Sequence, residues 1–152
     1  MSLATKFVGL KLGSPVLVAS GPASHDVNQI ALAGEKGAGA SVLKTVCSEK
    51  YYHMRFWQRP RYKLLDWDKQ IAGRSHSFSL YSYEQGYSGT LEDYWEFIRK
   101  CKERAKVPII GSIFADDAKD WEELAVKVEE SGADAIELDI SSPHKPGSLG
   151  FE

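Results

Sequence analysis

Residues 108–140, PIIGSIFADDAKDWEELAVKVEESGADAIELDI, decide the fold class of this chain. The continuous apolar run at 108–113 is typical of a strand buried in a parallel sheet. Asp116–Ser131 predicts a helix, because its apolar residues recur at helical spacing. These inward-facing residues are Trp121, Leu124, Ala125 and Val128. Gly132 ends the helix and Ala133–Ile140 predicts the next buried strand, so the stretch is a strand–helix–strand unit with parallel strands.

The same alternation runs through the preceding part of the chain. Val16–Ala19 and Ser41–Leu43 are short apolar runs that predict strands, and helical spacing predicts a helix between them over Val27–Glu35. Thr90 is a residue type that caps helix N-termini, and the apolar spacing after it predicts a further helix. The whole pattern is that of successive βαβ units in an α/β fold.

Two architectures fit this pattern. One is a doubly wound sheet of four parallel strands, and the other is the first half of a (β/α)₈ TIM barrel, which takes about 250 residues. Both bind ligands at the carboxyl ends of their strands. We therefore expect four groups of residues to converge on one face: Ser20-Gly21, Lys44-Thr45, Ser112 and Asp139–His144.

An irregular segment separates the two halves. Cys47–Gly89 has many aromatic residues and no sustained periodicity, and so long an insertion in a compact domain is usually functional. We expect it to contain hairpins of its own. Between Lys44 and Arg74 there are eight basic and three acidic residues, a local charge of +5. This charge indicates either a surface that contacts an anion or a solvated loop.

Composition excludes several functional classes. The 152 residues carry 19 Lys+Arg and 21 Asp+Glu, so the chain is not a basic nucleic-acid binder. No apolar run reaches the roughly 18 residues of a transmembrane helix, and the N-terminus has no secretory h-region. Two cysteines do not make a disulfide scaffold. We expect one cytoplasmic domain with a small-molecule substrate and no nucleic-acid or membrane partner.

The predicted strand ends offer distinct chemistry. A lysine at the end of a buried strand needs an anion or a polar partner, or must extend to solvent, which is the structural alternative for Lys44. Ser142 is a poor base unless a group such as His144 takes up its proton. Cys47 and Cys101 lack CxxC spacing and the histidines lack HxxxH spacing, so we predict no metal site.

Four motifs, in order along the chain, resemble the dihydroorotate dehydrogenase family. They are Gly9–Leu12 with Pro15–Gly21, Gly37–Thr45, Arg59–Arg61 and Glu137–Gly147, where ELDISSPHKPG is close to the signature of that family. The resemblance implies a (β/α)₈ barrel that holds FMN at its C-terminal face. This chain would cover about the first four βα units over 1–152, with an irregular insertion at about 47–89.

The resemblance also implies roles for single residues. Ser142 occupies the position of the proton base, and Lys44 lies beside both flavin and substrate. The implied flavin contacts are Ala19, Ser20, Gly21, Lys44, Thr45, Ser112 and Asp139. The implied substrate contacts are Lys44, His76, Ser77, Phe78, Ser79, Leu80, Asp139 and His144. The implied reaction transfers a hydride between a small cyclic substrate and FMN.

Three positions depart from the family pattern. His76, Asp139 and His144 stand where the family has asparagine. An asparagine both donates and accepts hydrogen bonds, whereas an ionised aspartate only accepts and repels a carboxylate substrate. We therefore expect a substrate other than dihydroorotate.

A half-barrel has two open sheet edges, so a partner is expected. The partner is either the remainder of the barrel, if the sequence is truncated relative to its gene, or a second copy in a homo-oligomer. The third alternative is that the chain is a folded remnant. Two other functions stay open. One is a non-catalytic half-barrel that serves binding or assembly without flavin, and the other is an aldolase-type lyase with Lys44 as Schiff-base nucleophile.

Overall fold

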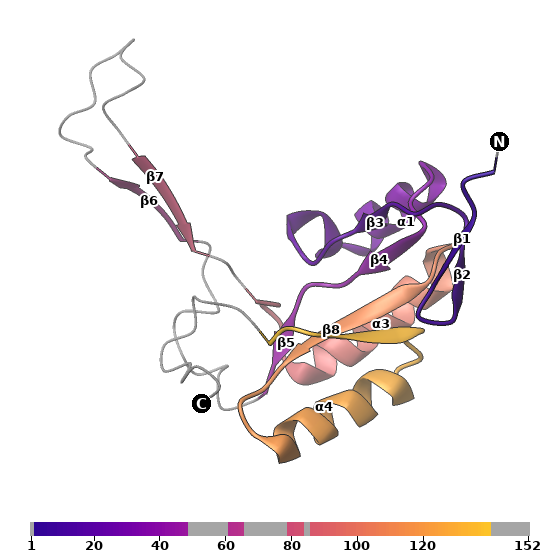
Figure 1. Cartoon of the computed structure of the whole chain (residues 1–152). Helices are drawn as coiled ribbons and strands as arrows, with labels where there is room; N and C mark the ends of the chain where they lie inside the picture. The colour runs from indigo at the N-terminus through magenta and orange to yellow at the C-terminus, as the bar shows by residue number, and fades with distance from the viewer. Residues whose placement is uncertain (1, 49–60, 66–78, 84–85, 141–152) are drawn as a thin grey trace, which may run out of the picture.

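The computed structural model describes residues 2–48, 61–65, 79–83 and 86–140, with only the backbone described in 61–65 and 79–83. Strands, a 3₁₀ turn and helices alternate along the chain (Figure 1). In chain order they are β1 (Thr5–Phe7), β2 (Leu10–Leu12), β3 (Leu17–Val18), η1 (Pro22–Ser24), α1 (Val27–Glu35), β4 (Ala40–Val42), β5 (Val46–Cys47), β6 (Arg61–Leu65), β7 (Ser79–Tyr83), α3 (Leu91–Arg104), β8 (Ile109–Phe114), α4 (Ala118–Glu130) and β9 (Ala135–Leu138).

Five of the strands form one parallel sheet. β8 is its centre, because it pairs with β4 and β5 along one edge and with β9 along the other. β3 lies outside β4, with Leu17 opposite Ala40. The parallel order confirms the predicted α/β fold and brings the carboxyl ends of the strands to one end of the sheet.

The main core lies between the sheet and the helices α1, α3 and α4. Leu43, Ile109 and Ile113 of the sheet are buried there against Ile30 of α1 and Tyr94 of α3. Figure 1 shows α3 and α4 side by side on the same face of β8. Helix periodicity predicted this face correctly, since apolar residues at helical spacing must share one side.

A smaller core covers the amino-terminal end of the opposite face. Leu12 of the antiparallel β1–β2 hairpin packs there against Val42, Ile110 and the partly buried Ala135. Ile109 and Ile110 belong to different cores, as the alternation of side chains along a strand requires. The hairpin leaves the carboxyl end of this second face to polar residues.

The helix predictions are confirmed with small changes at the ends. α1 spans the predicted residues, and Thr90 caps α3 by accepting a hydrogen bond from the N–H of Asp93 at 3.1 Å. α4 begins at Ala118 rather than Asp116, because the carboxylate of Asp117 caps it through the N–H of Asp120 at 2.9 Å.

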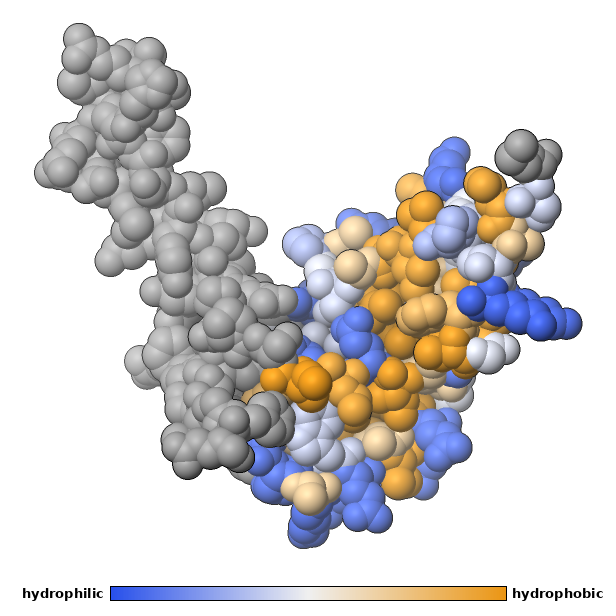
Figure 2. All heavy atoms as spheres, viewed as in Figure 1, coloured by the Kyte–Doolittle hydropathy of each residue, from blue (hydrophilic) through white to orange (hydrophobic). Residues whose placement is uncertain are grey.

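The prediction of a buried strand over Ala133–Ile140 is wrong in its burial. β9 covers only part of that range, and Ile136 and Leu138 are exposed, Leu138 by 55%. The reason is that, among the described strands, β9 pairs with β8 alone. Figure 2 shows hydrophobic residues gathered over the strands on the face turned to the viewer.

The irregular segment contains the hairpin that was expected. β6 and β7 pair antiparallel, with Arg61 opposite Tyr83 and Leu65 opposite Ser79. The chain returns to the sheet at Tyr87, whose N–H donates to the carbonyl of Thr45 at 2.7 Å. The segment therefore leaves and rejoins the sheet at the carboxyl end of the strands.

Candidate functional site

An extra residue interrupts the strand formed by β4 and β5. Val42 lies opposite Ile110 and Val46 lies opposite Ile113, so four steps on one strand match three on β8. Leu43 and Val46 also share the helix-side core, although residues three apart in a regular strand face opposite sides. The interruption is therefore a β-bulge, a device that redirects side chains.

The bulge places Lys44 and Thr45 together. Both are buried, with 6% and 5% of their surface exposed. Thr45 faces away from the helices, because it bonds the side chain of Ser112, and the preceding Gly111 is the residue that lies against Val128 of α4. Both residues that the sequence assigned to a strand end are thus buried, and Thr45 lies beside the hydroxyl of Ser112.

Hydrogen bonds join side chains across the strands at this level. Thr45 Oγ1 lies 3.1 Å from Ser20 Oγ and 2.9 Å from Ser112 Oγ. Ser112 Oγ in turn donates to Glu137 Oε1 at 2.8 Å. These hydrogen bonds link the turn after β3, the bulge before β5, and the strands β8 and β9. The four residues are called the hydroxyl chain below: Ser20, Thr45, Ser112 and Glu137. Three of its members were predicted to converge, and the structure confirms that they do.

The carboxylate gives the hydroxyl chain a direction. A carboxylate only accepts hydrogen bonds, so the hydroxyl of Ser112 donates its proton to Glu137. The oxygen of Ser112 must therefore accept a hydrogen bond from the hydroxyl of Thr45. Thr45 then accepts from Ser20, whose oxygen also accepts the backbone N–H of Thr45 at 3.1 Å. With their protons so committed, Ser20 and Thr45 present acceptor lone pairs to a ligand.

The turn after β3 is held by a residue that the sequence reading missed. Ser24 is fully buried, and its hydroxyl accepts the N–H of Gly21 at 2.9 Å while lying 3.1 Å from the carbonyl of Ala19. Its own carbonyl accepts the N–H of Lys44 at 3.3 Å. A serine three residues after glycine is a turn signal that was available in the sequence.

Tyr94 was also missed, because helical spacing marked it only as a core residue. Its hydroxyl accepts the backbone N–H of Ser112 at 3.1 Å and donates to the carbonyl of the same residue at 3.2 Å. Complete burial raises the pKa of Tyr94 well above its ordinary value. The phenol therefore stays protonated and donates.

The structure describes only some of the remaining residues that were predicted for the site. Asp139 is half-buried after β9, and its N–H donates to the carbonyl of Ile113 at 3.0 Å. Ser79 and Leu80 lie in β7, of which only the backbone is described. The others lie outside the described residues: His76, Ser77, Phe78, Ser142 and His144.

An acidic cluster stands at the start of α4. Single carboxylate oxygens of Asp116, Asp117 and Asp120 lie within 4.8 Å of one another, and the first two residues are exposed. Asp117 is already used as the helix cap. The expectation of no metal site stays a prediction.

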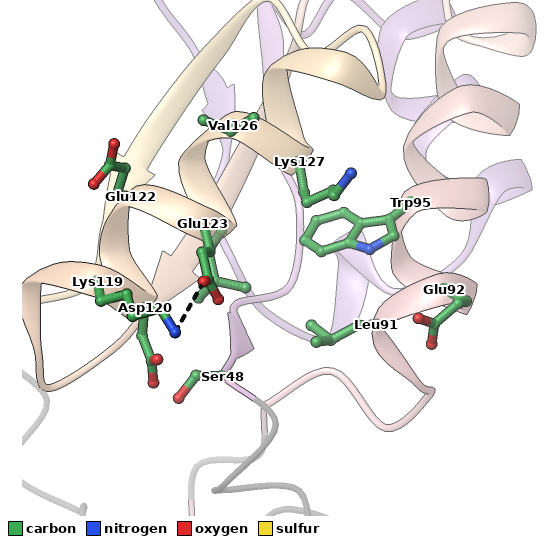
Figure 3. Close-up of a pocket in the computed structure, with 11 residues that line it drawn as sticks. Ser48, Leu91, Glu92, Trp95, Lys119, Asp120, Glu122, Glu123, Val126 and Lys127 are labelled. Carbon is green, nitrogen blue, oxygen red and sulfur yellow. Dashed lines mark ion pairs between the residues drawn. The ribbon is translucent and has the colours of Figure 1, made fainter.

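A groove of about 820 Å³ opens between α3 and α4, outside the predicted site. Figure 3 shows Leu91 and Trp95 of α3 on one side and Lys119 and Glu123 of α4, which form an ion pair, on the other. The groove lies on the helix side of the sheet, whereas the hydroxyl chain lies on the opposite side. The lining of the groove contains none of the predicted site residues. It is therefore a separate surface feature.

No helix in the described part of the chain combines the length and the apolar character needed to cross a membrane.

Comparison with known proteins shows the family. The family model described as dihydroorotate dehydrogenase matches residues 2–152. The catalytic subunit of dihydroorotate dehydrogenase B (NAD(+)) from Thermoplasma volcanium is 34% identical over 152 residues, which cover 99% of this chain and 44% of that protein. The chloroplastic dihydropyrimidine dehydrogenase (NADP(+)) of Arabidopsis thaliana is 30% identical over 138 residues, 90% of this chain and 32% of that protein.

The NAD-dependent dihydropyrimidine dehydrogenase subunit PreA of Escherichia coli is 29% identical over 142 residues, 93% of this chain and 32% of that protein. The chain thus spans less than half the length of these relatives. The family fold is a TIM barrel, which decides between the two architectures that the pattern allowed. This chain, with its parallel βα units, belongs to the dihydroorotate dehydrogenase family and covers the N-terminal part of the barrel.

Proposed function

We propose that this chain is the N-terminal half of an FMN-dependent oxidoreductase that transfers a hydride between FMN and a small cyclic substrate. In this proposal residues 1–152 form half of one barrel domain, and the segment at about 47–89 is an insertion beside the site. The observation that carries the proposal is the bulge at Lys44-Thr45, where a buried lysine directly precedes Thr45, a member of the hydroxyl chain, at the carboxyl ends of parallel strands. Family relatives whose names describe dehydrogenases of dihydroorotate and dihydropyrimidine support the reaction class.

The residues present fit a flavin. Ala19 is exposed, and a Cβ added at Gly21 would meet only the carbonyl oxygen of Ala19, at 3.8 Å, so the turn leaves open space for a flat ring. Ser20 and Thr45 supply acceptors for ring N–H or ribityl hydroxyl groups. Lys44 supplies a positive charge in a buried setting, where charge acts strongly on a neighbouring electron-rich group.

Each residue then has a defined task. FMN, when bound, supplies the hydride acceptor. Lys44 holds the ring and stabilises negative charge that develops on it, Ser20, Thr45, Ser112 and Asp139 hold the ring edge, and Ser142 takes a proton from the substrate carbon. The substrate lies near Lys44, Asp139 and His144. Asp139 disfavours a carboxylate substrate such as dihydroorotate, so a neutral ring is the better candidate.

The test is a fluorescence titration of the chain with FMN, in parallel with the Lys44→Met variant. We expect saturable binding that is weak for a flavoprotein, and a loss of about tenfold or more in Lys44→Met, since hydrogen bonds to charged groups contribute about 1.5–3 kcal/mol. Lys106→Met, which removes an exposed lysine, is the matched control and should bind as the unmodified chain does. Absence of saturable binding by the unmodified chain would contradict the proposal.

A second candidate, a half-barrel that serves assembly without flavin, is favoured by the two sheet edges. Among the described strands, β3 pairs only with β4 and β9 only with β8, and Val16 and Leu138 beside these edges are 65% and 55% exposed. Unpaired sheet edges with exposed apolar residues are prone to pair with other chains. A second copy, or the remainder of a barrel, would cover both.

We expect the chain to sediment as a dimer or larger species at tens of micromolar, because covering the two edges buries apolar surface. Leu138→Lys should shift the distribution towards monomer. Val126→Lys places the same charge on an exposed apolar residue of α4 and should leave the distribution unchanged. A chain that sediments as a monomer at every concentration would contradict self-assembly.

A further inference from the structure

We propose that Tyr94 is a positioning residue of the candidate site, an inference that rests on the proposed function. Its hydroxyl takes the place of a missing strand neighbour at the bulge. By doing so it keeps the bulge in register, and with it the placement of Lys44 and Thr45.

The missing neighbour is visible in the hydrogen bonds of β8. The carbonyl of Ile110 accepts the N–H of Leu43 at 2.9 Å, and the carbonyl of Phe114 accepts the N–H of Ser48 at 3.2 Å. Ser112 lies midway between these two residues, and alternate residues of a parallel strand bond to the same neighbour. Its N–H and C=O therefore point at the bulge, where Tyr94 satisfies both.

The backbone groups on the other side of the bulge are also diverted. The N–H of Thr45 donates to Ser20 Oγ at 3.1 Å, and the carbonyl of Thr45 accepts the N–H of Tyr87 at 2.7 Å. The two sides of the bulge are thus satisfied by different partners. A buried bulge persists only when its freed polar groups find such partners, since an unsatisfied buried group is costly.

Removal of the phenol oxygen leaves the N–H and C=O of Ser112 without partners. The bulge is then no longer held in one register, so it opens to water more often, and in these openings the residues after Lys44 move by one position. A one-residue shift turns each side chain to the other face. Thr45 would then leave Ser20 and Ser112, and the hydroxyl chain would break.

The position of the phenol is fixed by its surroundings. Tyr94 is fully buried, and its ring makes edge contacts with Tyr87 at 4.9 Å and with Trp95 at 5.5 Å between centroids. The packing of the ring therefore fixes the position of the hydroxyl. Tyr87 is a natural control, because its own hydroxyl donates only weakly, to the carbonyl of Asp93 at 3.4 Å near the surface.

The experiment compares Tyr94→Phe with Tyr87→Phe by amide hydrogen exchange and by acylation of lysines read by mass spectrometry. In Tyr94→Phe we expect exchange at Ser112 and Thr45 to accelerate about tenfold or more, the equivalent of about 1.4 kcal/mol. Acylation of Lys44 should accelerate relative to the exposed lysines, while exchange at Ile30 in α1 changes less. Tyr87→Phe should leave all of these rates as they are.

Uniform acceleration over the whole core, or no change at Ser112 and Lys44, would overturn the proposal. If Tyr94→Phe does not fold, incorporation of 3-fluorotyrosine keeps every ring and changes only the phenols. The amide resonance of Ser112 should then shift while that of Ile109 stays, and an unmoved Ser112 resonance overturns the proposal. Both readouts need no FMN, so failure of the chain to bind FMN would defeat the proposed function and leave the positioning role standing.

Discussion

Replacing Gly39 with alanine is expected to lower the free energy of unfolding by about 3 kcal/mol or more, in excess of ordinary overpacking. A Cβ at this position would overlap the carbonyl oxygen of Ser14 and approach Leu12 Cβ to 3.3 Å. The carbonyl is backbone and cannot rotate away. The N–H of Gly39 is also bonded to the carbonyl of Val16 at 2.7 Å, which prevents the strand from moving aside. Urea denaturation followed by circular dichroism measures the loss.

Gly13→Ala is the matched control for this variant. Gly13 lies in the turn after β2, directly before the Ser14 that Gly39 faces, and a Cβ built there meets nothing within 4 Å. Its substitution should change the free energy of unfolding by about 0.5 kcal/mol or less, as at other open surface positions. A similar loss in both variants would mean that glycine flexibility, and not the contact with Ser14, determines the cost.

Much of the fold can be predicted from residues that are close together in the sequence. The helices at Val27–Glu35 and after Thr90 follow from apolar spacing and from a capping residue, and both signals depend only on residues within a few positions. Exposure of a strand is different. The apolar residues of β9 predicted burial, but whether they are covered depends on a neighbour that the strand itself does not encode.

The site also has a part that could be predicted from the sequence and a part that could not. Lys44, Thr45 and Ser112 were predictable because parallel strands bring their carboxyl ends together. The bulge was not, because neither glycine nor proline marks it and it appears only in the register against β8. Tyr94 was invisible as a site residue for the same reason. Its role depends on the backbone groups of Ser112, 18 residues away, which the bulge leaves without a strand partner.

The chain should lose stability steeply in alkali. Burial, and then the negative charge of Asp26, raise the pKa of Cys101 from 9.0 to about 12, and burial also raises the pKa of Tyr94. In the unfolded chain both groups release protons at their ordinary values, while the folded chain retains them. Stability is therefore fully present below about pH 9 and falls by about 1.4 kcal/mol per pH unit for each group that only the unfolded state has ionised. Urea midpoints measured from about pH 8 to about pH 11 follow this decline.

Cys101→Ala separates the two groups. Between about pH 9 and pH 10 the thiol of Cys101 titrates in the unfolded state before the phenol of Tyr94 does. Stability should therefore decline less steeply there in Cys101→Ala than in the unmodified chain, although its starting stability is lower because a buried sulfur is removed. Above about pH 10 the phenol of Tyr94 adds its own slope in both proteins. An equal slope for Cys101→Ala and the unmodified chain over the lower interval would mean that Cys101 ionises while folded. Since Cys101 and Tyr94 lie on the same face of α3, that result would also imply that this face opens to water without global unfolding.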